Sequence, residues 1–218
     1  MTTFDLVIFD CDGVLVDTEG IGNEVLSAVL ANYGIAMDAS AARDRYEGFA
    51  VGDIARDVEV EFGVRLQKDW TEQYYDVLIG SLRDRAQPIP GVEDAIQRLE
   101  REGILVCVAS QGPLAKIEAS LRSAGLWDKF KGRAFSAKSV PNPKPAPDIY
   151  LHIARSFRLP EQRCAVIEDS IPGISAGLAA GMQVFAFCSE GCRDDMKSIG
   201  AIPFHAMDEL PDVLLARW

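Results

Sequence analysis

The sequence predicts an α/β protein, with a doubly wound parallel sheet as its core and an all-helical domain inserted after the first strand. Short unbroken apolar runs, typical of strands buried on both faces of a parallel sheet, occur at 6–9, 104–109, 164–167 and 183–187. Helical segments of about a dozen residues separate the later runs, as crossover connections between parallel strands require. Between residues 20 and 86 no strong strand-like run occurs, which indicates an inserted helical block.

The elements of the inserted block follow from apolar periodicity and from the placement of glycine, proline and aspartate. Helices are expected at 22–33, 53–62 and 69–85. Gly34 and Gly63 stand directly after two of these helices as C′ residues, and Asp53 and Asp69 are predicted N-caps. The prolines and glycine of segment 87–91 mark the return to the sheet. The predicted domains are therefore a core of residues 1–17 and 87–218 and a helical domain of residues 18–86.

From residue 91 onward, helices and strands alternate. Helices are expected at 92–102, 113–124, 148–157, 172–180 and 207–217, and strands at 104–109, 134–136, 164–167 and 183–187. Strands connected in this way lie parallel, so their carboxyl ends share one edge of the sheet. Open α/β sheets bind their ligands at that edge, which makes it the place to look for functional residues.

The composition argues against several classes of protein. With 218 residues, 48% of them hydrophobic and 25% charged, the chain has the make-up of a globular protein with a sizeable core. The formal net charge of -11 argues against nucleic acid or an anionic membrane as the partner. No basic segment precedes an apolar one at the N-terminus, and the longest uncharged run, 170–189, contains Pro172 and makes a poor membrane span. We therefore expect a cytoplasmic protein, a monomer or a weak homodimer, without nucleic-acid or membrane partners.

Polar side chains follow four of the predicted strands, always on the C-terminal side. They are Asp10 and Asp12, Ser110 and Gln111, Lys144, and Glu168 with Asp169. Taken singly, each has an ordinary structural explanation as a turn residue, a helix N-terminal acid or a solvated loop lysine. Because all of them occur in chain order at one edge of the sheet, we expect them to converge on one crevice.

These groups suit the transfer of a phosphoryl group. Neighbouring carboxylates repel each other unless a cation or a shared proton relieves them, and Mg²⁺ is bound by one or two carboxylates together with water and phosphate oxygens. Ser110 offers a hydroxyl and Lys144 a positive charge to a phosphate. An aspartate can act as the nucleophile in such a transfer, while a second carboxyl protonates the leaving oxygen and then activates water. The pattern predicts a metal-dependent site built on the first strand.

The same residues resemble the four motifs of the haloacid dehalogenase-like hydrolases. The motifs are the run from Asp10 to Thr18, Ser110, Lys144-Pro145-Ala146-Pro147, and Glu168-Asp169-Ser170. The match covers the whole chain and is similar to the branch that holds phosphoglycolate phosphatase, β-phosphoglucomutase and small sugar phosphatases. Segments 110–113, 181–188 and 210–218 look most like 6-phosphogluconate phosphatase-type members. The resemblance implies a Rossmann-like core, a helical cap domain over the site, and Mg²⁺-dependent phosphate ester hydrolysis through an aspartyl-phosphate.

The resemblance also implies a role for each motif residue. Asp10 is the nucleophile and a Mg²⁺ ligand, and Asp12 is the general acid and base that lends its backbone carbonyl to the metal. Ser110, Gln111 and Lys144 hold the phosphoryl group. Asp169 is a further metal ligand, with Glu168 near the metal directly or through water. An aspartate at position 12 argues against dehalogenation, in which no leaving alcohol needs a proton.

The segment from Glu47 to Asp53 resembles the specificity loop of the cap in such relatives, and its candidate substrate contacts are Glu47, Gly48 and Phe49. Mutases and several sugar phosphatases carry Arg or Lys shortly after the first glycine of this loop, where this chain has Ala50 and Val51. This difference argues against a mutase and against 6-phosphogluconate as the substrate. Two upstream arginines are candidates to replace the missing cation, Arg43 and Arg45.

The hypothesis that follows is a Mg²⁺-dependent phosphatase that acts on a small phosphorylated metabolite, a sugar or sugar-acid phosphate, through an aspartyl-phosphate. Two alternatives stay open. One is a sugar-phosphate mutase similar to β-phosphoglucomutase, and the other is a regulator that binds a phosphorylated metabolite without turning it over.

Overall fold

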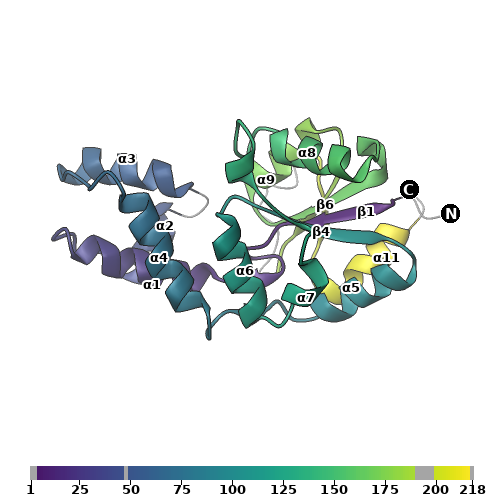
Figure 1. Ribbon diagram of the computed structural model, residues 1–218, viewed down its shortest axis with the longest axis horizontal. Coiled ribbons are helices and arrows are strands. Elements are labelled where there is room, and N and C mark those ends of the chain that lie inside the picture. Colours follow the sequence, from purple (N-terminus) through teal and green to yellow (C-terminus); the bar gives the residue numbers. More distant parts are fainter. Residues whose placement is uncertain (1–3, 47–48, 190–198, 217–218) are drawn as a thin grey trace.

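A six-stranded parallel sheet forms the centre of the protein (Figure 1). The computed structural model describes residues 4–46, 49–189 and 199–216. The strand order is β5-β4-β1-β6-β7-β8, with bounds β1 (Leu6–Phe9), β4 (Leu105–Ser110), β5 (Ala134–Ser136), β6 (Cys164–Glu168), β7 (Gln183–Phe187) and β8 (Ile202–Phe204). Strand β1 lies between β4 and β6, at the point where the strand order reverses. The predicted doubly wound sheet is confirmed, and its ligand-binding edge lies beside the end of β1.

Helices cover both faces of this sheet (Figure 1). On one face lie α8 (Asp148–Phe157) and α9 (Ile171–Ala179), and on the other α5 (Val92–Arg101), α7 (Trp127–Phe130) and α11 (Leu210–Leu215). Because side chains alternate along a strand, Leu6 and Ile8 join the buried cluster that includes α8 and α9, whereas Val7 and Phe9 join the cluster of the opposite face. This two-sided burial explains why β1 reads as an unbroken apolar run rather than an alternating one.

Four helices lie together beside the sheet (Figure 1): α1 (Glu19–Ala31), α2 (Ala39–Tyr46), α3 (Val51–Phe62) and α4 (Trp70–Leu82). The chain leaves the sheet through β2 (Val16–Asp17) and returns through β3 (Gln87–Pro88), and these two segments pair as an antiparallel ribbon. Helix α6 (Leu114–Ser123) of the core packs against α4. An all-helical insertion after the first strand is therefore present, while the domain boundaries, 1–17 with 87–218 and 18–86, stay a prediction. In the described part of the chain, no helix is long and apolar enough to cross a membrane.

Several details differ from the sequence-based expectations. Helix α2 was not predicted, because only Ala42 and Tyr46 of its eight residues are buried and its apolar stripe is correspondingly thin. Strand β8 was not predicted either, because it contains Pro203, which a sheet accepts only at an edge or a bulge. The predicted N-cap at Asp53 is wrong, since α3 begins at Val51 after an N-cap at Ala50. Gly63 does end α3 in the left-handed conformation with φ of 63°, as predicted.

Candidate active site

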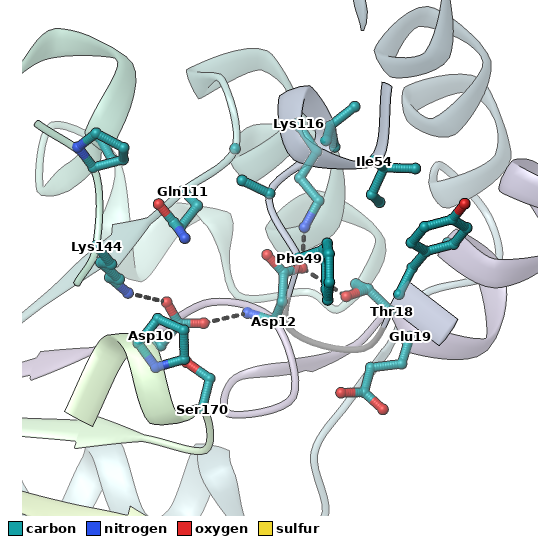
Figure 2. A pocket seen from close by; sticks show the side chains of 18 of the residues that line it. Asp10, Asp12, Thr18, Glu19, Phe49, Ile54, Gln111, Lys116, Lys144 and Ser170 are labelled. Atoms are coloured by element: carbon teal, nitrogen blue, oxygen red, sulfur yellow. Dashed lines mark hydrogen bonds and ion pairs between the residues drawn. The ribbon is translucent and has the colours of Figure 1, made fainter. Parts of the chain in front are cut away.

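The polar residues that follow the strands meet at one edge of the sheet (Figure 2). Asp10 directly follows β1, Ser110 ends β4 and Glu168 ends β6, so the three come from neighbouring strands. Lys144, from the loop after β5, reaches the same place. The predicted convergence on one crevice is therefore observed, while the chemical role of each residue stays a prediction.

Lys144 links two carboxylates at the centre of the site. Its side chain is buried, and its Nζ lies 2.5 Å from Asp10 Oδ1 and 2.6 Å from Glu168 Oε1, and donates to the carbonyl of Ala109 at 3.2 Å. Burial alone would lower the pKa of Lys144, but Asp10 and Glu168 raise it well above its usual value, so the ammonium stays charged. Burial is the main cause that raises the pKa of Asp10, Lys144 opposes it, and the charges of Glu168 and Asp12 add to it, with a net pKa of about 7.

Glu168 is fully occupied by protein donors. Besides Lys144, its Oε1 accepts a hydrogen bond from the hydroxyl of Tyr150 at 2.9 Å. Its Oε2 accepts from the Ser170 hydroxyl at 2.9 Å and from the backbone N–H groups of Asp169 and Ser170, each at 3.2 Å. A carboxylate offers about four lone-pair sites, and these five donors engage them all. Glu168 would therefore bind a metal ion directly only by giving up one of its protein donors.

The carboxylate of Asp169, unlike that of Glu168, is not held by protein donors within the described residues. Within the described ranges no protein donor reaches its carboxylate. Burial raises the pKa of Asp169 well above its usual value, and the neighbouring carboxylates, Glu168 and Asp10 foremost, raise it further. Ligand atoms of Asp10, Glu168 and Asp169 all lie within 4.8 Å of one another. Three carboxylates that share a single ammonium leave a negative charge that a divalent cation would offset, so the donor set fits a hard metal ion.

The carboxylate of Asp12 has none of the hydrogen-bond and ion-pair partners that hold the Asp10 carboxylate. Its Oδ1 accepts from the Thr18 hydroxyl at 2.6 Å and forms an ion pair with Nζ of Lys116, and its Oδ2 accepts from the Ser110 hydroxyl at 3.3 Å (Figure 2). Burial raises the pKa of Asp12, but Lys116 and the hydrogen bonds outweigh it, and the net effect is a lowered pKa. The two aspartates of the Asp10-x-Asp12 motif thus have different lysine partners, Lys144 for Asp10 and Lys116 for Asp12. The pKa of Asp10 is raised, and that of Asp12 is lowered.

Lys116 is a site residue that the sequence analysis missed. It lies in the first turn of α6 and is only 5% exposed. Sequence reasoning treats a lysine in a helix as solvated by default. The sequence did contain an indication that Lys116 is buried. Lys116 falls on the same face of the helix as the apolar and small residues Ile117, Ser120 and Leu121, which are also buried.

A cavity of about 760 Å³ opens between this site and the helical insertion. Gln111 and Phe49 both line it, as does Arg43. Phe49 is 51% exposed and packs edge-on against Tyr46, with 5.9 Å between ring centroids. The other two predicted substrate contacts, Glu47 and Gly48, lie outside the described residues. Arg45, the second arginine considered as a substitute cation, is instead paired with Asp57 on the outside of the insertion.

Gly13 is required by the packing of this site, which gives a first prediction. Its φ is +74°, and a Cβ at this position would lie 1.9 Å from Asp169 Oδ2. We expect Gly13→Ala to displace the Asp169 carboxylate and to lower the kcat/KM of the reaction at this site by roughly 10²-fold, the usual cost of misplacing a reacting group by about 1 Å. Gly34→Ala is the matched control, because Gly34 has a φ of +75° and nothing within 4 Å of the added Cβ. Equal effects of the two substitutions, measured by kinetics and thermal unfolding, would contradict the prediction.

The fold and the site together define an α/β enzyme with an acidic, cation-accepting centre. The family model described as haloacid dehalogenase-like hydrolase matches residues 4–181, and the chain belongs to this family. The resemblance inferred from the four motifs is therefore confirmed.

Two relatives named as phosphatases narrow the enzyme class, and a similar solved structure supports the fold. The 6-phosphogluconate phosphatase of Escherichia coli (strain K12) is 29% identical over 217 residues, which cover 100% of this chain and 97% of that protein. Hexitol phosphatase B of the same strain is 27% identical over 195 residues, 88% of this chain and 87% of that protein. The crystal structure of a haloacid dehalogenase-like protein of unknown function from Agrobacterium tumefaciens str. C58 superimposes with a TM-score of 0.80 at 33% identity, covering 97% of each chain. Within its family, the chain is a phosphoric monoester hydrolase.

Proposed function

We propose that this protein is a Mg²⁺-dependent phosphatase that hydrolyses a small phosphorylated metabolite, a sugar or sugar-acid phosphate, through an aspartyl-phosphate on Asp10. The observation that carries the proposal is the contrast between the two motif aspartates. Asp10 is held by Lys144 and by the backbone N–H of Asp12, which donates to its Oδ2 at 2.9 Å. Asp12 is held by Lys116, Thr18 and Ser110 instead. Two carboxylates in such different surroundings suit two different tasks.

In the first half of the reaction, a carboxylate oxygen of Asp10 attacks the phosphorus atom and the ester P–O bond breaks. Asp12 must be protonated for this step, although Lys116 lowers its pKa, and it gives its proton to the leaving oxygen, which departs as an alcohol. The ammonium of Lys144 and the hydroxyl of Ser110 face the phosphoryl group and balance its negative charge. A divalent cation bound by Asp10 and Asp169 would supply further positive charge to the phosphoryl oxygens.

In the second half, water attacks the phosphorus of the aspartyl-phosphate. Asp12, now a carboxylate, accepts a proton from this water, the bond between Asp10 and phosphorus breaks, and inorganic phosphate is released. Both proton transfers use the same carboxyl group, so the enzyme returns to its starting state with no other proton carrier.

The cavity supports a sugar or sugar-acid phosphate as the substrate. Hydroxyl and amide groups in its lining can form hydrogen bonds with sugar hydroxyls. Cationic side chains in the lining can pair with a second anionic group of the substrate. These residues are Asn23, Tyr46, Tyr74, Tyr75, Gln111, Arg43 and Lys138. Two of the relatives, a 6-phosphogluconate phosphatase and a hexitol phosphatase, are named for such compounds.

The test is a screen of the purified protein with Mg²⁺ against hexose phosphates, hexitol phosphates, sugar-acid phosphates and nucleotides. We expect release of inorganic phosphate, with kcat/KM for the best sugar or sugar-acid phosphate at least about tenfold above that for nucleotides, a margin of about 1.4 kcal/mol in transition-state binding. Preference for nucleotides would contradict the substrate class. Conversion of a hexose monophosphate into an isomer would instead support the mutase, against which Ala50 and Val51 in the cavity wall argue. Binding without turnover would indicate a silent regulator.

A further inference from the structure

The ion pair between Lys116 and Asp12 joins two parts of the chain that are 104 residues apart. The stem of Lys116 packs against Gly112, where an added Cβ would lie 3.1 Å from the lysine Cδ. Its ammonium enters the cavity wall, and Asp12 is its salt-bridge partner. Burying a lysine costs free energy unless it is paired, so the contact with Asp12 fixes the position of both groups.

The donors around Asp12 are divided unevenly between its two oxygens. Thr18 and Lys116 both bind Oδ1, whereas among the described residues Oδ2 accepts only the longer hydrogen bond from Ser110, at 3.3 Å. Figure 2 shows Lys116 and Thr18 on the side of Asp12 that is turned away from Asp10 and Lys144. Oδ2 is therefore the oxygen that is left available on the side of the phosphoryl-transfer centre.

We propose that Lys116 is a positioning residue for the general acid, holding Asp12 by Oδ1 so that Oδ2 faces the leaving-group oxygen of the substrate. This inference rests on the proposed phosphatase function. It assigns the proton transfer to one atom: the O–H bond at Oδ2 breaks as the ester P–O bond breaks, and the proton moves to the departing oxygen. Lys116 itself neither gains nor loses a proton.

Leaving-group dependence of kcat/KM tests this assignment. This parameter covers only the steps up to release of the alcohol, so it reports the acid role of Asp12 and not its later role as a base. An alkyl phosphate needs protonation of its leaving oxygen, whereas p-nitrophenyl phosphate does not. We expect Lys116→Met to lower kcat/KM for the alkyl phosphate by roughly 10²-fold, the low end of general acid catalysis, and that for p-nitrophenyl phosphate by less than about threefold.

Two further variants separate positioning from a merely structural ion pair. Lys116→Arg keeps the charge, and we expect it to restore most of the alkyl phosphate activity. The ratio to compare is kcat/KM for the alkyl phosphate divided by kcat/KM for p-nitrophenyl phosphate. In an Asp12→Asn background, Lys116→Met should leave this ratio unchanged, because Lys116 acts through Asp12. Lys131→Met, on the exposed turn after α7, is the control for loss of a lysine charge.

Two outcomes would overturn the inference. One is an unchanged ratio in Lys116→Met, whether both activities fall equally or neither falls, and the other is a continued drop of the ratio in the Asp12→Asn background. If the Met variant does not fold, Lys116→Arg serves alone, and an equal loss on both substrates then contradicts the inference. Absence of turnover of either substrate by the wild-type protein would instead contradict the proposed function, so the two failures are distinguishable.

Discussion

Asp10→Asn should abolish turnover of every phosphate ester, lowering kcat by roughly 10⁴- to 10⁶-fold, as removal of a nucleophile does in other enzymes that form covalent intermediates. The amide has nearly the same shape as the carboxylate, but it is not a nucleophile and cannot form the acyl phosphate. The fold should survive, because the substitution relieves repulsion from Glu168 and Asp12, although one contact of Lys144 is weakened. Steady-state kinetics on p-nitrophenyl phosphate and on the best sugar phosphate measure the effect.

Asp128→Asn is the matched control for this experiment, because Asp128 is an exposed carboxylate on α7 that is not among the residues lining the cavity. It should keep wild-type kinetics. A second measurement addresses the intermediate itself: acid quenching of the wild-type protein during turnover should give a peptide containing Asp10 that is heavier by one phosphoryl group. Near-normal turnover by Asp10→Asn would refute the aspartyl-phosphate, whatever the substrate is.

Removal of divalent metal should have the second large effect. Asp10 and Asp169 lie in a carboxylate cluster with too little positive charge of its own, and the phosphoryl group adds more negative charge. Loss of a cation that stabilises transition-state charge by several kcal/mol corresponds to a decrease in kcat of at least about 10³-fold. Dialysis against a chelator, followed by Mg²⁺ titration, measures the loss and its recovery. Full activity in the chelator would contradict a metal-dependent reaction.

Thermal unfolding provides an independent readout of metal binding. At a Mg²⁺ concentration of about 100 times Kd, binding to the folded state adds about 2.7 kcal/mol of stability, which for a protein of this size raises Tm by roughly 5–10 °C. In Asp169→Asn this shift should disappear, while the metal-free Tm should be no lower than that of the wild type, because one unbalanced carboxylate has been removed. Asp84→Asn, an exposed change on the insertion, should retain the shift. Equal shifts in both variants would place the metal elsewhere.

Elements with strong local signals were predictable from the sequence. Strand β1 is four apolar residues in a row, because both of its faces are buried. Helix α5 buries Val92, Ala95, Ile96 and Leu99, a spacing that is visible without a structure. Elements with weak local signals were not predictable, since α2 has only two buried residues and β8 contains a proline that only its edge position accommodates.

Individual side-chain contacts required the tertiary structure. By residue type alone, Glu168 and Asp169 are two neighbouring acids with the same chemistry. In the fold, Glu168 is saturated by Lys144, Tyr150 and the turn at Ser170, whereas Asp169 has no protein donor within the described residues. The difference depends on which strands are neighbours and on how the turn after β6 is directed, and neither is a property of the local sequence.

The sequence by itself determined the sheet, the inserted helices and the order of the polar groups along one edge, because periodicity and spacing are local properties of the chain. Only the tertiary structure decided which atoms meet. It placed Lys116, which reads as a solvated helix lysine, against Asp12, and so divided the two motif aspartates between different cations. Such a pairing depends on the strand order and on the rotation of α6 about its axis, both of which are set by packing over the whole core rather than by residues near position 116.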